Sequence, residues 1–229
     1  MIPKTIHQTH YDENLDFVIQ SKKSIEETNS SWDYKFWSNE MAQDLVVNSF
    51  PEFSDHWLSL HNSNIIKWNL FRFMVVHACG GLYVDSDTIF NKSIDKIIDL
   101  SVDFVGVKKH KMEIWIKDHF FLAPKNSKFL YHCIREIVHK NINHDPSGVS
   151  VKDVHSFCGG PFLYSKLNMY DKNNTFNYQL LNPIFVTNHK LKFEGYKNFQ
   201  KENQRFNWNE VYVLHLLNDS WRRTKKKRK

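Results

Sequence analysis

Cysteine is scarce in this chain, and long apolar runs are missing. The three cysteines among 229 residues show no Cys-x-x-Cys spacing, which argues against a disulfide framework and against a zinc site. The sequence contains no run of about 18 apolar residues, so it predicts no transmembrane helix. The N-terminal MIPKTIHQTH lacks the layout of a signal peptide. We therefore expect a soluble, cytoplasmic protein in which Cys79, Cys133 and Cys158 are small buried hydrophobic residues.

Positive charge is scarce outside the C-terminus. The formal net charge is +6, but the tail RRTKKKRK at 222–229 carries seven positive charges, so residues 1–221 carry a net charge of −1. This balance argues against a basic nucleic-acid-binding surface on the body of the protein. We expect a disordered tail, with attraction to an anionic membrane or to nucleic acid as the alternative.

Repeats and low-complexity linkers are also absent, which predicts a single domain over 1–221. Apolar periodicity predicts strands that alternate with helices, and hence an α/β sandwich. The predicted strands are 2–9, 33–38, 82–84, 103–108, 119–125, 182–188 and 210–217. The predicted helices are 39–50, 64–79, 126–140 and 159–167, with one more between the first two strands and another that begins at Pro51.

One of the chain's two Gly-Gly pairs lies in HACGGLYVDSDTIF at 77–90. Gly80 is expected to end the helix 64–79, since glycine accepts the left-handed conformation of a C-terminal cap. Gly81 then turns the chain into a short strand whose end presents Asp85 and Asp87 on one side. Two adjacent carboxylates favour a hard divalent cation such as Mg²⁺ or Mn²⁺, although a surface pair in a turn is the alternative.

The helix before this motif carries polar residues in an apolar register. Asn69 and Arg72 are three residues apart and therefore neighbours on the helix surface. An unpaired charge is costly to bury, so Arg72 is expected to face a carboxylate or an anionic ligand. The alternative is a structural salt bridge to Asp85 or Asp87.

The run KWNLFRFMVVHACGGLYVDSDTIF resembles the sugar-nucleotide-binding segment of family 32 glycosyltransferases of the capsular-polysaccharide type. That family has Asp-x-x-Arg on a helix and then Gly-Gly-x-Tyr-x-Asp-x-Asp. The run is also similar to the catalytic domain of the large clostridial glucosylating toxins. Four further segments extend the resemblance over most of the chain, in the order that the family has them: IPKTIHQT, WDYKFWSNE, GGPFLYSKL and HLLNDSW.

The resemblance implies a GT-A fold, a Rossmann-like mixed sheet flanked by helices. It also implies a retaining glycosyltransferase that uses Mn²⁺ or Mg²⁺ and a UDP- or GDP-sugar. By position, Asp85 and Asp87 would hold the metal and the ribose, with His215 or Ser220 completing the shell. The donor would also contact Gln8, His10, Asn69, Arg72, Tyr83, Ser86 and Trp221. A satisfied buried imidazole and a core anchor are the alternatives for His215 and Trp221.

Two positions depart from the family's pattern. Asn69 stands where aspartate is usual, and His10 stands where tryptophan is usual near the end of the first strand. A weak or inactive nucleotide-sugar-binding relative is therefore an alternative. His7 and His10 do not predict a metal pair, because residues three apart on a strand face opposite sides.

The acceptor is expected to be a glycan, a glycolipid or a protein, bound by the polar stretches 109–120 and 141–158. Among the carboxylates, Asp118, Asp153 and Glu194 have no feature that separates a nucleophile from a surface acid. A rival enzyme class is the haloacid-dehalogenase-like phosphatases, because VDSDTI comes close to their Asp-x-Asp motif. That motif normally opens its domain, whereas here about eighty residues precede it.

Overall fold

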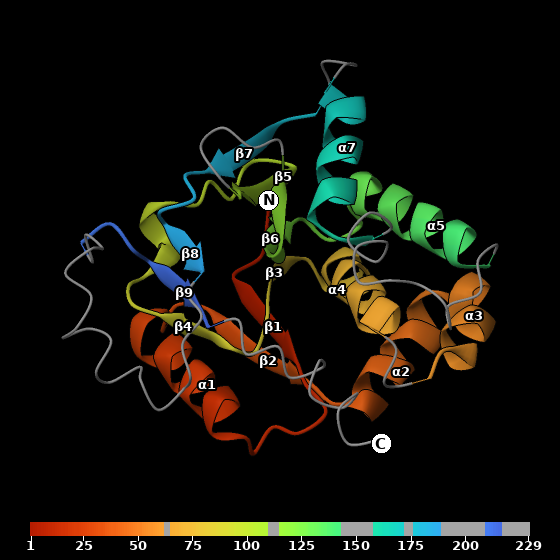
Figure 1. Cartoon of the computed structure of the whole chain (residues 1–229), viewed down its shortest axis with the longest axis horizontal. Helices are drawn as coiled ribbons and strands as arrows, with labels where there is room; N and C mark the ends of the chain where they lie inside the picture. The colour runs from red at the N-terminus through yellow and green to blue at the C-terminus, as the bar shows by residue number, and fades with distance from the viewer. Residues whose placement is uncertain (62–64, 110–114, 143–157, 172–175, 189–208, 217–229) are drawn as a thin grey trace, which may run out of the picture.

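The computed structural model describes residues 1–61, 65–109, 115–142, 158–171, 176–188 and 209–216. Six strands form its central sheet in the order β2-β1-β3-β6-β5-β7 (Figure 1). Their bounds are Thr5–Thr9 for β1, Asp33–Trp37 for β2, Gly81–Val84 for β3, Phe104–Lys108 for β5, Ile116–Ala123 for β6 and Tyr178–Leu181 for β7. β6 runs antiparallel to β3 and β5, whereas the other neighbours are parallel. The predicted α/β class with a mixed sheet is therefore confirmed.

Helices cover one face of this sheet. They are α2 (Asn39–Ser49), the 3-10 turn η1 (Pro51–Phe53), α3 (Ser54–Ser59), α4 (Ile65–Cys79), α5 (Lys128–Ile142) and α7 (Gly160–Asp171). α4 contacts α2, α5, β3 and β6, which explains why it is apolar on nearly every side. The predicted apolar stripe of α5 is buried in the same core, and it comprises Leu130, Cys133, Ile134, Ile137 and Val138.

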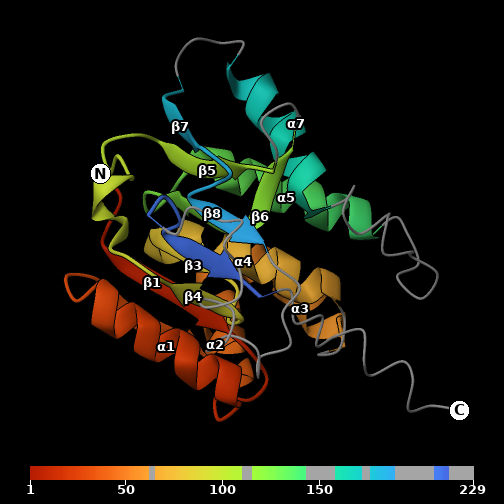
Figure 2. The same cartoon turned by 60° about the vertical axis from the view of Figure 1, so that its left-hand side comes forward.

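The other face packs against helix α1 (Asp16–Thr28) and a second sheet of three strands. This small sheet has the order β4-β9-β8, with β4 at Thr88–Phe90, β8 at Val186–Asn188 and β9 at Val213–His215. The 3-10 turn η2 (Ile94–Lys96) adds Ile94 to this second core. Figure 2 shows the small sheet and α1 on the same side of the central sheet.

The glycine pair allows β3 to approach β1 closely. Gly80 has φ 72° and ends α4, and its N–H donates to the carbonyl oxygen of Val76 at 2.8 Å. Gly81 has φ 102°, and a Cβ there would lie 2.4 Å from the carbonyl oxygen of Thr5. Any other residue at this position would therefore push the two strands apart.

His7 of β1 stabilises the junction between α4 and β3 through its side chain. Its Nε2 lies 2.8 Å from the carbonyl oxygen of Gly80, and the indole Nε1 of Trp37 donates to its Nδ1 at 3.2 Å. Because an indole N–H can only donate, the Nδ1 atom accepts and Nε2 carries the proton. Burial lowers the pKa of His7 to about 4, so the imidazole is neutral and structural.

Most predicted elements are confirmed, with differences near the C-terminal half. β6 begins at Ile116, so the prediction that residues 116–120 belong to an acceptor loop is wrong: these residues pair with β5 and β3 inside the sheet. Of the predicted strand 182–188, only Val186–Asn188 forms a strand, and β7 was not predicted. The stretches 110–114 and 143–157 lie outside the described residues.

The cysteines are free. Cys133 and Cys158 are buried, as predicted, whereas Cys79 is only partly buried. Among the described helices, none combines the length and the hydropathy needed to cross a membrane.

Replacing Gly81 by alanine should lower the free energy of unfolding by at least about 2 kcal/mol, because the new Cβ meets the backbone of β1 in a left-handed conformation. Urea unfolding would measure the loss. Gly106→Ala is the comparison variant, since the Cβ there meets the side chains of Phe104 and Ile116 and not backbone, and Gly106 has no left-handed φ. Equal losses in the two variants would contradict this account of the junction.

The free energy of unfolding should fall as the pH falls from 6.5 towards 4. The folded pKa of His7 lies below the unfolded value of 6.5, so the unfolded chain takes up the proton first and is favoured in acid. The full loss from this residue is roughly 3 kcal/mol below pH 4. His7→Gln, which keeps a donor and an acceptor, should show a shallower dependence in urea unfolding at pH 7, 5 and 4. The same slope in both proteins would show that His7 does not cause it.

Candidate metal and donor site

The two aspartates of the Asp-x-Asp motif lie in a tight turn that joins the two sheets. Asp85 directly follows β3 and Asp87 directly precedes β4, so strand alternation, on which the sequence argument relied, does not align them. The N–H of Asp85 donates to the carbonyl oxygen of His119 at 3.2 Å, and the N–H of Leu216 donates to that of Asp87 at 2.9 Å. The turn is thus held by strands from both sheets.

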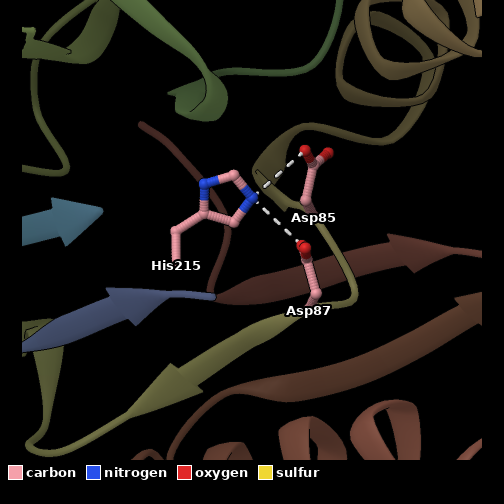
Figure 3. A group of neighbouring side chains, drawn as sticks. All are labelled: Asp85, Asp87 and His215. Atoms are coloured by element: carbon pink, nitrogen blue, oxygen red, sulfur yellow. Dashed lines mark ion pairs between the residues drawn. The ribbon is translucent and has the colours of Figure 1, made fainter. Parts of the chain in front are cut away.

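His215, at the end of β9, completes a group with these two carboxylates. Its Nε2 lies 3.0 Å from Oδ1 of Asp87 and 3.8 Å from Oδ2 of Asp85 (Figure 3). One ligand atom from each of the three residues lies within 4.8 Å of the other two. Two carboxylates and one imidazole make a donor set that suits Mn²⁺ and tolerates Mg²⁺.

The charges of this group are unbalanced. Burial raises the pKa of Asp85, and Arg72 and His215 oppose that rise while the Asp87 carboxylate adds to it. Burial favours the neutral imidazole of His215, but Asp87 and Asp85 outweigh it and raise the pKa of His215. The carboxylates therefore attract whatever positive charge is near, and a divalent cation between them would relieve their repulsion.

Arg72 on α4 is buried beside the motif, as its register predicted. Its Nη1 donates to the carbonyl oxygen of Asp118 at 2.9 Å and lies 3.3 Å from Oδ2 of the same residue. Its Nη2 lies 3.6 Å from Oδ1 of Asp85, and the guanidinium lies over the ring of Tyr83 at 5.3 Å. The carboxylates of Asp85 and Asp118 raise the pKa of Arg72 despite its burial, so it stays charged.

Asp118 is the residue that sequence reasoning missed. Its spacing looked like that of a surface acid, yet its carboxylate side chain is only 20% exposed and pairs with Arg72. The available signal was the polar triplet Lys-Asp-His at 117–119, which immediately precedes the apolar run Phe-Phe-Leu-Ala of the same strand.

Three of the predicted donor-binding residues are buried around the turn. Gln8 donates from Nε2 to Oγ of Ser21 at 2.8 Å and to the carbonyl oxygen of Asp85 at 3.1 Å, so its amide supports the turn. Tyr83 and Ser86 are also buried, and burial together with Asp85 raises the pKa of Tyr83 well above 10.

The remaining predicted donor-binding residues are spread over three places. Asn69 is buried and donates from Nδ2 to Sγ of Cys158 at 3.3 Å. His10 follows β1 and is half-buried, and its ring packs on that of Tyr11 with centroids 4.2 Å apart. Burial lowers the pKa of His10, against the opposing influence of Asp12 and Asp87. Ser220 and Trp221 lie outside the described residues, as do Asp153 and Glu194.

Residues 16–102 match the family described as glycosyltransferase sugar-binding region containing a DXD motif. The matched stretch includes Asp85 and Asp87, which are the Asp-x-Asp of this chain. Residues 16–102 of this chain are therefore similar to the sugar-binding region of DXD glycosyltransferases.

Two relatives agree with this assignment. The chain is 26% identical over 98 residues to inositol phosphoceramide mannosyltransferase 3 of Schizosaccharomyces pombe, which covers 42% of this chain and 27% of that protein. It is 22% identical over 230 residues to the uncharacterized glycosyltransferase L373 of Acanthamoeba polyphaga mimivirus. This match covers 96% of this chain and 84% of the viral protein. The matches span between 26% and 43% of the lengths of four fungal relatives.

The fold agrees with that of a solved glycosyltransferase. PaToxG glycosyltransferase superposes with a TM-score of 0.54 and 13% identity, over 76% of this chain and 72% of that one. The predicted GT-A fold is therefore confirmed, as is the predicted resemblance to glycosyltransferases.

Removal of the Arg72 charge should destabilise the protein. Arg72→Met leaves the Asp85 and Asp118 carboxylates without their cation, and we expect a loss of about 3 kcal/mol in the free energy of unfolding. This value is at the lower end of the range of destabilisation expected when a buried ion pair is broken, because both carboxylates keep some exposure to water. Urea unfolding would measure it.

The double variant Arg72→Met, Asp118→Asn should lose less than the sum of the single variants, since it removes both charges. Arg135→Met on the exposed side of α5 is the control and should cost less than about 0.5 kcal/mol. Strict additivity of the two site variants would contradict the pairing.

Proposed function

We propose that this protein is a divalent-metal-dependent glycosyltransferase that moves a sugar from a nucleotide-sugar to a glycan, lipid-linked or protein acceptor. The observation that carries the proposal is the convergence of Asp85, Asp87 and His215, which have ligand atoms within 4.8 Å of one another beside a buried arginine. Asp85 and Asp87 lie within residues 16–102, the region similar to glycosyltransferases, and the fold that brings His215 to them is similar to that of a solved glycosyltransferase.

Asp85, Asp87 and His215 would hold Mn²⁺ or Mg²⁺, and their two carboxylates and imidazole suit either ion. Bound there, the ion would supply Lewis-acid neutralisation of the charge on the diphosphate leaving group. The chain's own contribution is rigidity, because backbone hydrogen bonds from β6 and from residue 216 hold the turn before any ligand arrives.

Arg72 would supply a fixed positive charge next to the donor. Its guanidinium is held by a hydrogen bond to the Asp118 carbonyl oxygen, an ion pair with the Asp118 carboxylate and the ring of Tyr83, so little side-chain freedom is left to lose on binding. Asn69, one turn earlier on α4, would offer an amide to a sugar hydroxyl in the role that the family pattern gives to that position. Retention of the anomeric configuration is a proposal that rests on the same family resemblance.

The names of the fungal relatives select the first donor and acceptor to test. Inositol phosphoceramide mannosyltransferase 3 is named for mannose transfer to a phosphoinositol lipid. We therefore propose GDP-mannose and UDP-hexoses as donors, and phosphoinositol lipids before free glycans as acceptors. A lipid acceptor would also give the basic tail 222–229 a role in contact with an anionic membrane.

The donor site can be tested by thermal melting with UDP, GDP and their sugar conjugates, with and without Mn²⁺. A ligand at 100 times its Kd adds about 2.7 kcal/mol, which raises the midpoint of a chain of this size by roughly 5 to 10 °C. We expect a Mn²⁺-dependent rise with one nucleotide in the parent protein. The rise should be absent in Asp87→Asn, which keeps the shape of the side chain but removes its charge.

Two controls make the melting result decisive. Asp55→Asn removes a carboxylate from α3, away from the site, and should keep the full rise. An assay with a generic aryl phosphate and Mg²⁺ should release no phosphate, whereas a haloacid-dehalogenase-like phosphatase would release it. No shift with any nucleotide at millimolar concentration would overturn the proposal, and binding without sugar transfer would identify an inactive relative.

A further inference from the structure

The candidate metal ligands come from two different sheets. Asp85 follows β3 of the central sheet, whereas Asp87 directly precedes β4 of the small sheet and His215 is the last residue of β9, the middle strand of the small sheet. The 3.8 Å separation between His215 Nε2 and Asp85 Oδ2 therefore depends on how the two sheets are placed against each other. Contacts that bridge the two sheets therefore bear directly on the geometry of this group.

Strand β6 of the central sheet makes such contacts with two of its side chains. Lys117 is 6% exposed, and its Nζ donates a hydrogen bond to the carbonyl oxygen of Val186 in β8. Asp118, the next residue, turns the other way and pairs with Arg72 on α4. Neighbouring residues of one strand thus reach opposite sides of the site, as strand alternation requires.

His119 makes the second contact with the small sheet. Its ring stacks on that of His215 with centroids 3.9 Å apart and an interplanar angle of 27°. Its carbonyl oxygen accepts the N–H of Asp85 at 3.2 Å. One residue therefore touches a candidate ligand from each sheet, through its backbone on one side and its ring on the other.

Lys117 is an expensive residue to place at this position. Its burial opposes the charged ammonium and lowers its pKa to about 8. An apolar side chain would fill the same space without this cost. The gain from lysine is a long side chain that reaches a specific carbonyl of β8, the neighbour of the strand that carries His215.

We propose that Lys117 and His119 are positioning residues that hold the small sheet against the central sheet and so fix the ring of His215 relative to Asp85. The proposal rests on the proposed function only in its assumption that His215 helps to bind a metal ion. Neither residue is proposed to touch the donor or the acceptor.

The test compares Lys117→Met, Lys117→Arg, His119→Leu and His119→Phe with a matched control. Lys166→Met is that control, because Lys166 is another buried lysine, 8% exposed, but its Nζ binds Glu136 of α5 on the helical face. Two quantities would be measured: the affinity for Mn²⁺ from the electron paramagnetic resonance signal of the free ion, and amide hydrogen exchange in β8 and β9 without metal.

Lys117→Met and His119→Leu should each weaken Mn²⁺ binding about tenfold, as loss of a supporting contact does at metal sites. Both should speed exchange at the amides of β9. Lys117→Arg keeps a long donor and His119→Phe keeps an aromatic stack, so each should recover most of both losses. Lys166→Met should lower the melting temperature without changing either quantity.

The positioning role would be overturned if Lys117→Met and His119→Leu left both the Mn²⁺ affinity and the hydrogen exchange unchanged. In that outcome their melting temperatures would be lowered no more than that of Lys166→Met. Failure of the parent protein to bind Mn²⁺ would instead overturn the metal part of the proposed function. In that case the exchange measurement, made without metal, still decides whether the two side chains hold the small sheet.

Discussion

Three carboxylates share a small region with one buried guanidinium, and this imbalance of charge shapes the rest of the site. Arg72 pairs with Asp118 and approaches Asp85, while His215 approaches Asp87. Asp87 and Asp85 raise the pKa of His215, but even with a protonated imidazole the three carboxylates outnumber the two positive charges. Burial makes the repulsion between the carboxylates stronger than it would be in water. Such an arrangement opposes folding in the absence of a cation and favours binding when a cation is present.

The surrounding fold holds these like charges together at the junction of two sheets. The turn 85–87 cannot spread, because backbone hydrogen bonds from β6 and from residue 216 hold both of its ends. The stability of the two apolar cores thus sustains a local arrangement that is unfavourable by itself.

Strand β6 connects this charge cluster to the rest of the molecule. Its apolar half, Phe120 to Ala123, lies in the two cores on either side of the central sheet. Its polar half, Lys117 to His119, reaches the small sheet in one direction and α4 in the other. A single strand therefore couples packing to the geometry of the site. A loop in this place would lack the anchoring in both cores that holds residues 117–119 in position.

The sequence by itself determined the local features. Apolar periodicity identified α4 and α5, the glycine pair identified the junction after α4, and an arginine in an apolar register identified a buried ion pair. Each of these signals depends on neighbours in the chain, so short-range physical rules suffice to predict it.

Only the tertiary structure decided which distant residues meet. The family resemblance had placed His215 in one shell with Asp87, 128 positions away, but no local pattern in the chain did so. Nothing in the sequence paired Asp118 with Arg72 across 46 positions. No spacing rule could select Asp118 from the other acids, because its partner comes from a helix that packs on the sheet. Long-range pairing depends on how the sheets and helices stack, and that stacking is a property of the whole core and not of any one segment.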